Sequence, residues 1–192
     1  ELLIYNGMDS KYEHKLLTKQ IAVLPKDLRW TFNHTNKLAR TLAITESVGL
    51  PLDLEIAKKY SKDYEVTMKD IESKISKRRE VKEFEKMKHT PFKLGSNTQL
   101  ITVFRDILKV EQIKTTPKGG FCVDEETLNA YSNKGIELAS LMIQHRKASK
   151  QKSTYVDSIV DKMYDDGLIR PDYMHLFVVT GRLSATSPPI QT

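Results

Sequence analysis

The stretch PLDLEIAKKYSKDYEVTMKDIESKIS, residues 51–76, decides the fold class of this chain. Apolar side chains recur in it at steps of three and four residues: Tyr60, Tyr64, Met68, Ile71 and Ile75. Such steps place side chains on one face of an α-helix. Asp53 precedes the pattern and is well placed to cap the N-terminus of the helix. We therefore expect a long amphipathic helix that begins after Asp53 and continues toward Lys88.

Further helices are expected on both sides of this one, each delimited by a cap or a breaker residue. They cover residues 7–22, 27–48, 96–109, 124–131 and 135–164. After Gly167 the pattern changes, because YMHLFVVTGRLS, residues 173–184, is rich in the β-branched and aromatic residues typical of a strand. The expected fold class is mainly α: a long antiparallel helix pair with small helices between, ending in the first β-strand of an incomplete sheet.

Composition narrows the class of protein. The chain has 192 residues, of which 39% are hydrophobic, and this suits one domain or slightly more. The formal net charge of +6 is a weak indication of a polyanionic partner.

A single cysteine, Cys122, excludes an internal disulfide and a multi-cysteine zinc site. No apolar run approaches the roughly 18–20 residues that span a bilayer, so we expect no membrane partner and a cytoplasmic location. The first residues carry neither an initiator Met nor a signal-peptide pattern, so we expect the chain to be the middle of something longer.

A helical stretch free of carboxylates is the first candidate for a binding surface. In LMIQHRKASKQKSTY, residues 141–155, basic residues stand among hydroxyls, and no acidic residue occurs from Leu138 to Val156. Arg146 and Lys150 are four residues apart and share a helix face, and Ser153 follows three residues later. Lys152 lies roughly opposite Lys150. Cations with hydroxyl donors suit a phosphate backbone; a solvated basic helix remains the alternative.

The loop KTTPKGG, residues 114–120, has a similar character. Lys114 and Lys118 flank two threonines, and the glycines allow a close approach of the backbone. A duplex backbone is one partner for such a loop, and a bare turn with incidental lysines is the other interpretation. The glycine spacing matches neither common nucleotide-binding fingerprint.

Five segments resemble, in order, motifs of family A DNA polymerases of the bacterial polymerase I and phage type. They are VGLPLDLE (48–55), KLGSNTQL (93–100), KTTPKGGFCVDEETL (114–128), HRKASKQKSTYVD (145–157) and TGRLSATSPPIQ (180–191). YNGMD, Tyr5 to Asp9, is similar to the last exonuclease motif of the family, Tyr-x-x-x-Asp. The chain departs from the family pattern at Met174 and His175 and at Pro189, which replaces an Asn, and these departures suggest a phage-type member.

The resemblance implies three regions: residues 1–24 as the C-terminal helix of a 3′–5′ exonuclease domain, 25–168 as the thumb, and 169–192 as the truncated start of the palm. It implies DNA contacts from the basic helix, the thumb tip and the terminal arginine turn. These contacts would come from Arg146, Lys150, Lys152, Ser153, Thr154, Lys114, Lys118, Gly119, Arg182 and Gln191. Arg182 would reach the minor groove, where acceptors are present on every base pair. In the exonuclease remnant, Asp9 would ligate a metal ion only with upstream carboxylates that this sequence lacks, and Tyr5 would orient the attacking water.

The function implied is that of a portion of a DNA-directed DNA polymerase that grips the primer–template duplex. The parent enzyme would use Mg²⁺ held by palm aspartates. Those residues are absent from the sequence, so we expect no bound metal and no activity from these residues alone. The partners would be the duplex and the remaining palm, fingers and exonuclease portions, in the same chain or a separate one, in a bacterial cell or phage-infected host. Two alternatives stay open: a naturally split, non-catalytic DNA-binding subunit, and an interaction protein that has lost DNA binding.

Overall fold

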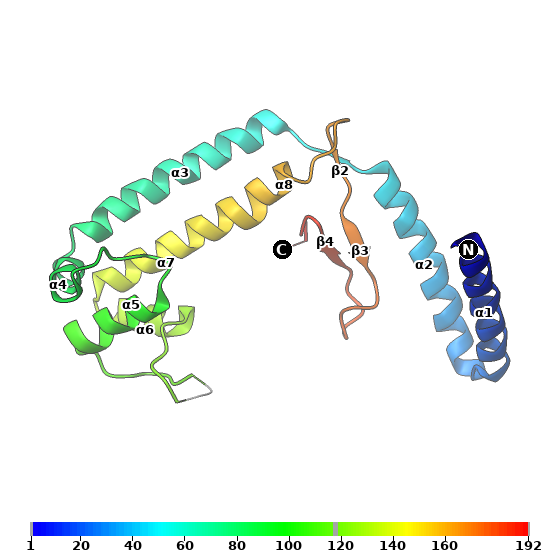
Figure 1. Ribbon diagram of the computed structural model, residues 1–192, viewed down its shortest axis with the longest axis horizontal. Helices are drawn as coiled ribbons and strands as arrows, with labels where there is room; N and C mark the ends of the chain where they lie inside the picture. Colours follow the sequence, from blue (N-terminus) through cyan, green and yellow to red (C-terminus); the bar gives the residue numbers. More distant parts are fainter. Residues whose placement is uncertain (1, 117–118, 192) are drawn as a thin grey trace.

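The fold is built around two long helical runs that lie side by side in opposite directions. The computed structural model describes residues 2–116 and 119–191. Helix α3 (Leu54–Ser76) runs one way. The return run consists of α7 (Glu137–Lys150), the π-type turns of η3 (Gln151–Asp157) and the short α8 (Ser158–Val160). Figure 1 shows the two runs extending along one another, and α3 packs against both α7 and η3. The expected antiparallel helix pair is confirmed.

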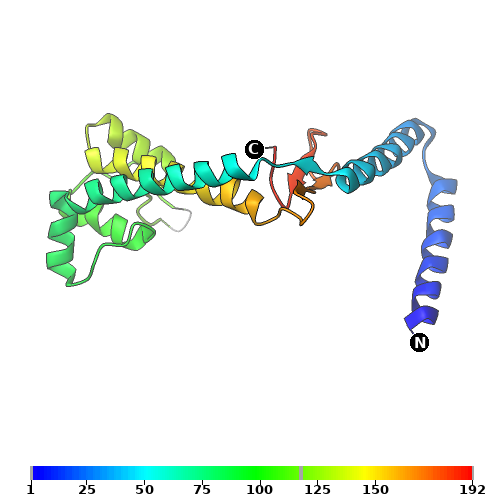
Figure 2. The ribbon, with the colours of Figure 1, turned by 90° about the horizontal axis from the view of Figure 1, so that it is seen from above.

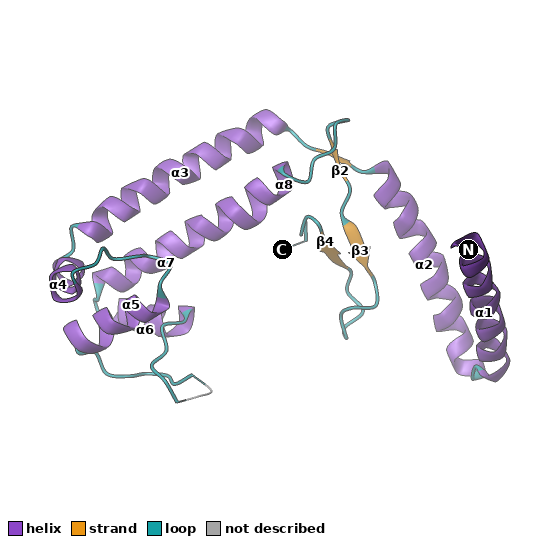
Figure 3. Ribbon diagram, in the orientation of Figure 1, coloured by secondary structure: helices purple, strands orange, loops and turns teal. Residues whose placement is uncertain are grey.

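Small helices lie between the two runs in the sequence, as predicted, and they gather at the end of the pair that is away from the strands. They are α4 (Arg79–Lys88), α5 (Asn97–Thr102), the π-type η2 (Val103–Ile107) and α6 (Glu125–Asn133). With α3 and α7 they enclose one hydrophobic core, whose fully buried members include Ile75, Val81, Leu100, Phe104, Leu128, Tyr131, Leu138 and Met142. Figure 3 shows that loops and short helices surround this end, while the other end of the pair leads to the strands.

Local capping explains where several of these helices begin. Asp53 accepts a hydrogen bond from the Ile56 amide at 3.0 Å at the start of α3. Ser96 does the same for Gln99 at α5, and Asp124 for Thr127 at α6. Each side chain satisfies an amide that has no partner inside its helix. These three predicted caps are confirmed.

Two further helices precede the pair. Helix α1 (Leu2–Val23) and helix α2 (Arg29–Val48) are joined by the short η1 (Lys26–Leu28). Figure 2 shows the two helices diverging from this joint. None of the α1 side chains is buried against the described residues. Helix α2 instead packs on β3 (Asp172–Met174), where Glu46 accepts a hydrogen bond from the Tyr173 amide at 2.6 Å.

Four short strands form two antiparallel pairs in the described part of the chain. β1 (Leu50–Pro51) pairs with β2 (Leu168–Ile169), and β3 pairs with β4 (Ser184–Thr186). The β1–β2 pair stands at the joint between α2 and the helix pair (Figure 1). This placement brings the start of α3 and the end of the return run to one point.

Three local predictions were wrong. The helix expected to reach Lys88 breaks at Arg78, whose backbone is extended and whose guanidinium binds both Glu80 and Glu137. The buried row of α3 passes through Ala57 and Ser61 rather than Tyr60, which is 55% exposed. A row through 57, 61, 64 and 68 alternates steps of four and three, and so follows the helical period more closely than the two successive steps of four from Tyr60 to Met68.

The third error concerns the strand. Residues 173–184 do not form one strand: β3 ends at Met174, and the chain turns through Gly181 (φ 72°) before β4. Leu176, Phe177 and Val179 in the connection are exposed. Their β-branched and aromatic character is typical of a strand, but within the described part of this segment strand pairing is limited to residues 172–174 and 184–186. No helix among the described residues is both long and apolar enough to cross a membrane.

Candidate nucleic-acid interface

A groove runs beside α7 at the end of the pair that carries the small helices. Its volume is about 690 Å³, and we call it the α7 groove. The polar residues lining it include Asn97, Thr116, Arg146, Lys150, Ser153 and Thr154. The sequence predicted that Arg146, Lys150 and Ser153 lie on one helix face, and these three and Thr154 all line the groove. Asp124 is the one carboxylate among the lining residues that the structure describes.

The cations of the α7 groove differ in what they bind. Lys150 is exposed and makes no hydrogen bond or ion pair with any described residue. Arg146 is partly buried, and it donates from Nη1 to the Val123 carbonyl and from Nη2 to Asn97 Oδ1, both at 2.8 Å. Ser153 donates to the Ser149 carbonyl, as hydroxyls on helices commonly do. Lys150 is thus the free positive charge of the groove, within the described part of the chain.

Lys152 is not among the residues that line the groove. This agrees with its predicted position, roughly opposite Lys150 on the helix. Its ammonium lies 2.6 Å from Asp157 Oδ2, and Asp157 Oδ1 accepts a hydrogen bond from Ser61 on α3. Burial raises the pKa of the Asp157 carboxyl, but the hydrogen bonds from Lys152 and Ser61 outweigh it, so this pKa lies below its ordinary value. In this conformation Lys152 contributes to helix packing.

The loop between η2 and α6 closes on itself at its base. Thr115 and Phe121 form an antiparallel bridge, and the Thr116 amide donates to the Gly120 carbonyl at 2.8 Å. Gly119 has a φ of 77°, a conformation that glycine adopts without strain. We call residues 115–121 the tip loop. Lys118, predicted to contact DNA, lies outside the described residues.

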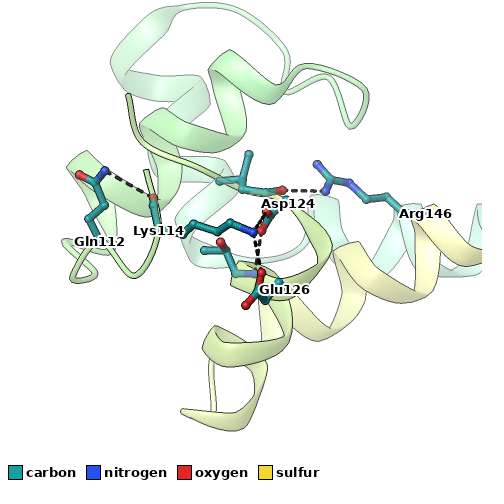
Figure 4. Close-up of polar contacts among 7 residues, drawn as sticks. Gln112, Lys114, Asp124, Glu126 and Arg146 are labelled. Atoms are coloured by element: carbon teal, nitrogen blue, oxygen red, sulfur yellow. Dashed lines mark hydrogen bonds and ion pairs between the residues drawn. The ribbon is translucent and has the colours of Figure 1, made fainter. Parts of the chain in front are cut away.

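Lys114, at the base of the tip loop, is neutralised by two carboxylates. Its ammonium lies 2.5 Å from Glu126 Oε2 and 3.0 Å from Asp124 Oδ2 (Figure 4). The hydrogen bonds that Lys114 donates to Glu126 and Asp124 raise the pKa of Lys114 above its ordinary value. The Thr127 amide, together with Lys114, holds the pKa of Asp124 well below its usual range.

The remaining predicted residues lie elsewhere. Arg182 and Gln191 are exposed, and neither lines the α7 groove. Tyr5 and Asp9 are exposed on α1. Among the described residues, no group of three or more His, Cys, Asp or Glu side chains could hold a metal ion.

Sequence reasoning missed Asn97 as part of this surface. Asn97 directly follows the Ser96 cap, so its position at a helix start beside a loop was visible in the sequence. Its contact with Arg146, 49 residues away, was not.

Comparison with known proteins identifies the family of the chain. A profile of the family described as DNA polymerase family A matches residues 54–192. The thermostable DNA polymerase I of Thermus caldophilus is 27% identical over 189 residues, which cover 97% of this chain and 22% of that protein. DNA polymerase I of Pseudomonas aeruginosa is 33% identical over 101 residues, which cover 52% of this chain and 11% of that protein. The chain thus spans about a fifth or less of the length of these relatives.

A solved structure gives the same result. The POL domain of Pol1 from M. smegmatis, in complex with DNA primer-template and dNTP, matches with a TM-score of 0.65 and 27% identity. The match covers 80% of this chain and 25% of that one. Since the family profile accounts for well over half of the residues, this chain belongs to DNA polymerase family A.

Proposed function

We propose that this chain is the duplex-holding portion of a DNA polymerase, and that the whole protein carries out template-directed nucleotidyl transfer in DNA replication or repair. The observation that carries the proposal is the α7 groove, where Arg146, Lys150, Ser153 and Thr154 line one surface. Family membership supports it, as does the similarity to a polymerase domain solved with primer-template DNA.

The composition of the groove favours a phosphate backbone over a specific base sequence. One unpaired ammonium with neighbouring hydroxyls supplies attraction and hydrogen bonds to phosphate oxygens without reading base edges. Such binding is largely independent of sequence and weakens steeply with salt, because each phosphate neutralised releases condensed counterions. A protein that must hold any primer–template duplex requires binding of this kind.

The regional assignment follows from the proposal. Residues 25–168 form the thumb, 1–24 the last helix of an exonuclease domain, and 169–192 the start of the palm. The tip loop with Lys114, Lys118 and Gly119 approaches the duplex, and Lys152 joins the phosphate contacts if its pair with Asp157 opens. Arg182 and Gln191 act at the primer terminus. The Mg²⁺ chemistry of nucleotidyl transfer belongs to residues of the whole protein outside this sequence, as do the carboxylates that would act with Asp9.

A finer placement within the family is also proposed. Met174, His175 and Pro189 depart from the common family pattern and favour a phage-type member. The partners would then be the primer–template duplex and the other portions of the polymerase, in the same chain or another.

Binding of a primed duplex tests the proposal. Fluorescence anisotropy would compare the wild-type chain with Lys150→Glu across a range of salt concentrations. We expect Lys150→Glu to weaken binding at least tenfold at low salt and to lower the slope of log K against log salt by about 1, the value for one lost phosphate contact.

Lys82→Glu is the matched control. Lys82 is exposed on α4, and it lies away from the α7 groove. The control changes net charge by the same amount, so we expect it to leave the slope unchanged. If both variants weakened DNA binding equally, the α7 groove would not be the binding site. If the wild-type chain did not bind primed duplex at low salt, the proposed function would be wrong.

A further inference from the structure

Arg146 joins three segments that the sequence separates. It stands on α7, and its two guanidinium nitrogens bind Val123, just after the tip loop, and Asn97, at the start of α5 before the loop. Val123 is 5% exposed, so its carbonyl lies at a well-packed position. One side chain therefore ties the residue that follows the tip loop, and the start of α5, to the helix that lines the groove.

The contacts inside the tip loop do not fix its position relative to α7. The Thr115–Phe121 bridge and the Thr116–Gly120 hydrogen bonds shape the loop internally. At its base, Gln112 donates to the carbonyls of Lys114 and Gly120, and Lys114 binds Asp124 and Glu126 (Figure 4). These contacts link the loop to α6. Among the hydrogen bonds and ion pairs of the described residues, Ser132 and Ser140 join α6 to α7, and those of Arg146 join Val123 and Asn97 directly to α7.

We propose that Arg146 is a positioning residue, which sets the place of the tip loop relative to the α7 groove by bridging Val123 and Asn97. The role differs from that of Lys150, whose ammonium is free. The consequence for DNA rests on the proposed duplex-holding function, whereas the bridge itself is a property of the folded chain.

Arginine and lysine distinguish this role from a phosphate contact. A guanidinium presents several N–H donors in a rigid fork and can serve two acceptors in different directions. Lysine keeps the charge, and with it most of a phosphate contact, but its single ammonium does not reproduce the fork. Arg146→Lys therefore removes the bridge while it retains the charge, and Asn97→Ala removes half of the bridge without touching any charge.

Two measurements on the full chain test the proposal. Hydrogen exchange would follow the amides of Thr115, Thr116 and residues 119–121, and primed-duplex affinity would be measured over a range of salt. We expect Asn97→Ala to speed exchange in the tip loop about tenfold, which corresponds to one lost charge-assisted hydrogen bond, and Arg146→Lys, which loses both bonds, to speed it at least as much. Both variants should weaken DNA binding severalfold with an unchanged salt slope, because no phosphate contact is lost.

Lys147→Gln is the matched control. Lys147 is the exposed neighbour of Arg146 and makes no hydrogen bond or ion pair with the described residues, so its loss should leave tip-loop exchange as in wild type. Wild-type exchange in Arg146→Lys would overturn the proposal, and so would Asn97→Ala binding DNA like wild type although its loop exchanges faster. If the wild-type chain binds no DNA, the proposed function fails, and the exchange data still decide whether the bridge exists.

Discussion

Ser61 and Asp157 are joined across the helix pair: Ser61 Oγ donates to Asp157 Oδ1 at 2.7 Å, over a separation of 96 residues. The same carboxylate binds the Lys152 ammonium through its other oxygen. Asp157 ends the π-type turns of η3, so the contact ties the widened part of the return helix to α3. The polar pair stands in the contact row of α3, at the position where a strictly apolar stripe would place a hydrophobic residue.

Asp157→Asn should destabilise the chain by about 1 kcal/mol. The asparagine can still accept from Ser61, but it carries no charge for Lys152. Because the side chain of Asp157 is 36% exposed, water partly screens its ion pair, and the expected loss of unfolding free energy stays small. Urea denaturation monitored by circular dichroism gives the free energy of unfolding. Asp161→Asn, an exposed carboxylate one turn later, is the control, and equal stability of the two variants would contradict the assigned role.

Stability should fall in acid because of the same carboxylate. The pKa of Asp157 lies below its ordinary value of 3.8 in the folded chain. A lowered pKa contributes stability that is present above the unfolded value and is lost as pH falls through the folded one. The difference in unfolding free energy between wild type and Asp157→Asn should therefore shrink as pH is lowered from about 7 to about 2.5. A difference that stays constant over this range would show that the charge of Asp157 contributes nothing.

The helix ends were predictable because their causes are local. Asp53, Ser96 and Asp124 each act within three residues of their own position, so the sequence contains the whole interaction. The break at Arg78 has no such local cause. No proline or glycine marks it, and one of its partners, Glu137, is 59 residues away.

The same distinction governs the candidate site. The sequence showed which segments carry positive charge, and it predicted the shared helix face of Arg146, Lys150 and Ser153, which all line the groove. It did not show which charges are already paired. Lys114 and Lys152 lie among cations in the sequence, yet each is held by a carboxylate that only the folded chain brings near. The sequence does not distinguish a free lysine from a paired one, because the pairing depends on tertiary contacts.

Phe104→Ala should cost about 3–5 kcal/mol, the typical range for truncation of a buried aromatic side chain. Phe104 and Tyr131 are fully buried and stack with their ring centroids 5.2 Å apart. Truncation removes one ring of that pair from the centre of the core that holds the small helices to α7. Chemical denaturation measures the loss. Trp30→Ala provides the comparison, since Trp30 is 73% exposed and its removal should change stability by no more than about 0.5 kcal/mol.

Gly49→Ala should destabilise the joint between α2 and the helix pair by roughly 1–3 kcal/mol. Gly49 has φ 77° and ψ 176°, a region that residues with a side chain rarely adopt, and a Cβ there would lie 3.1 Å from the Ile169 carbonyl oxygen. The added methyl group would push β2 from β1, so exchange of the β2 amides should rise together with the fall in melting temperature.

Gly7→Ala is the matched control for this substitution. Gly7 lies inside α1 with open space around it, so the same methyl group should raise helix stability by about 0.5–1 kcal/mol. Opposite signs for the two glycines would show that the backbone conformation at Gly49 decides the effect. If Gly49→Ala left β2 exchange unchanged, the joint would tolerate a side chain there, and the β1–β2 pair would not depend on a glycine at its entrance.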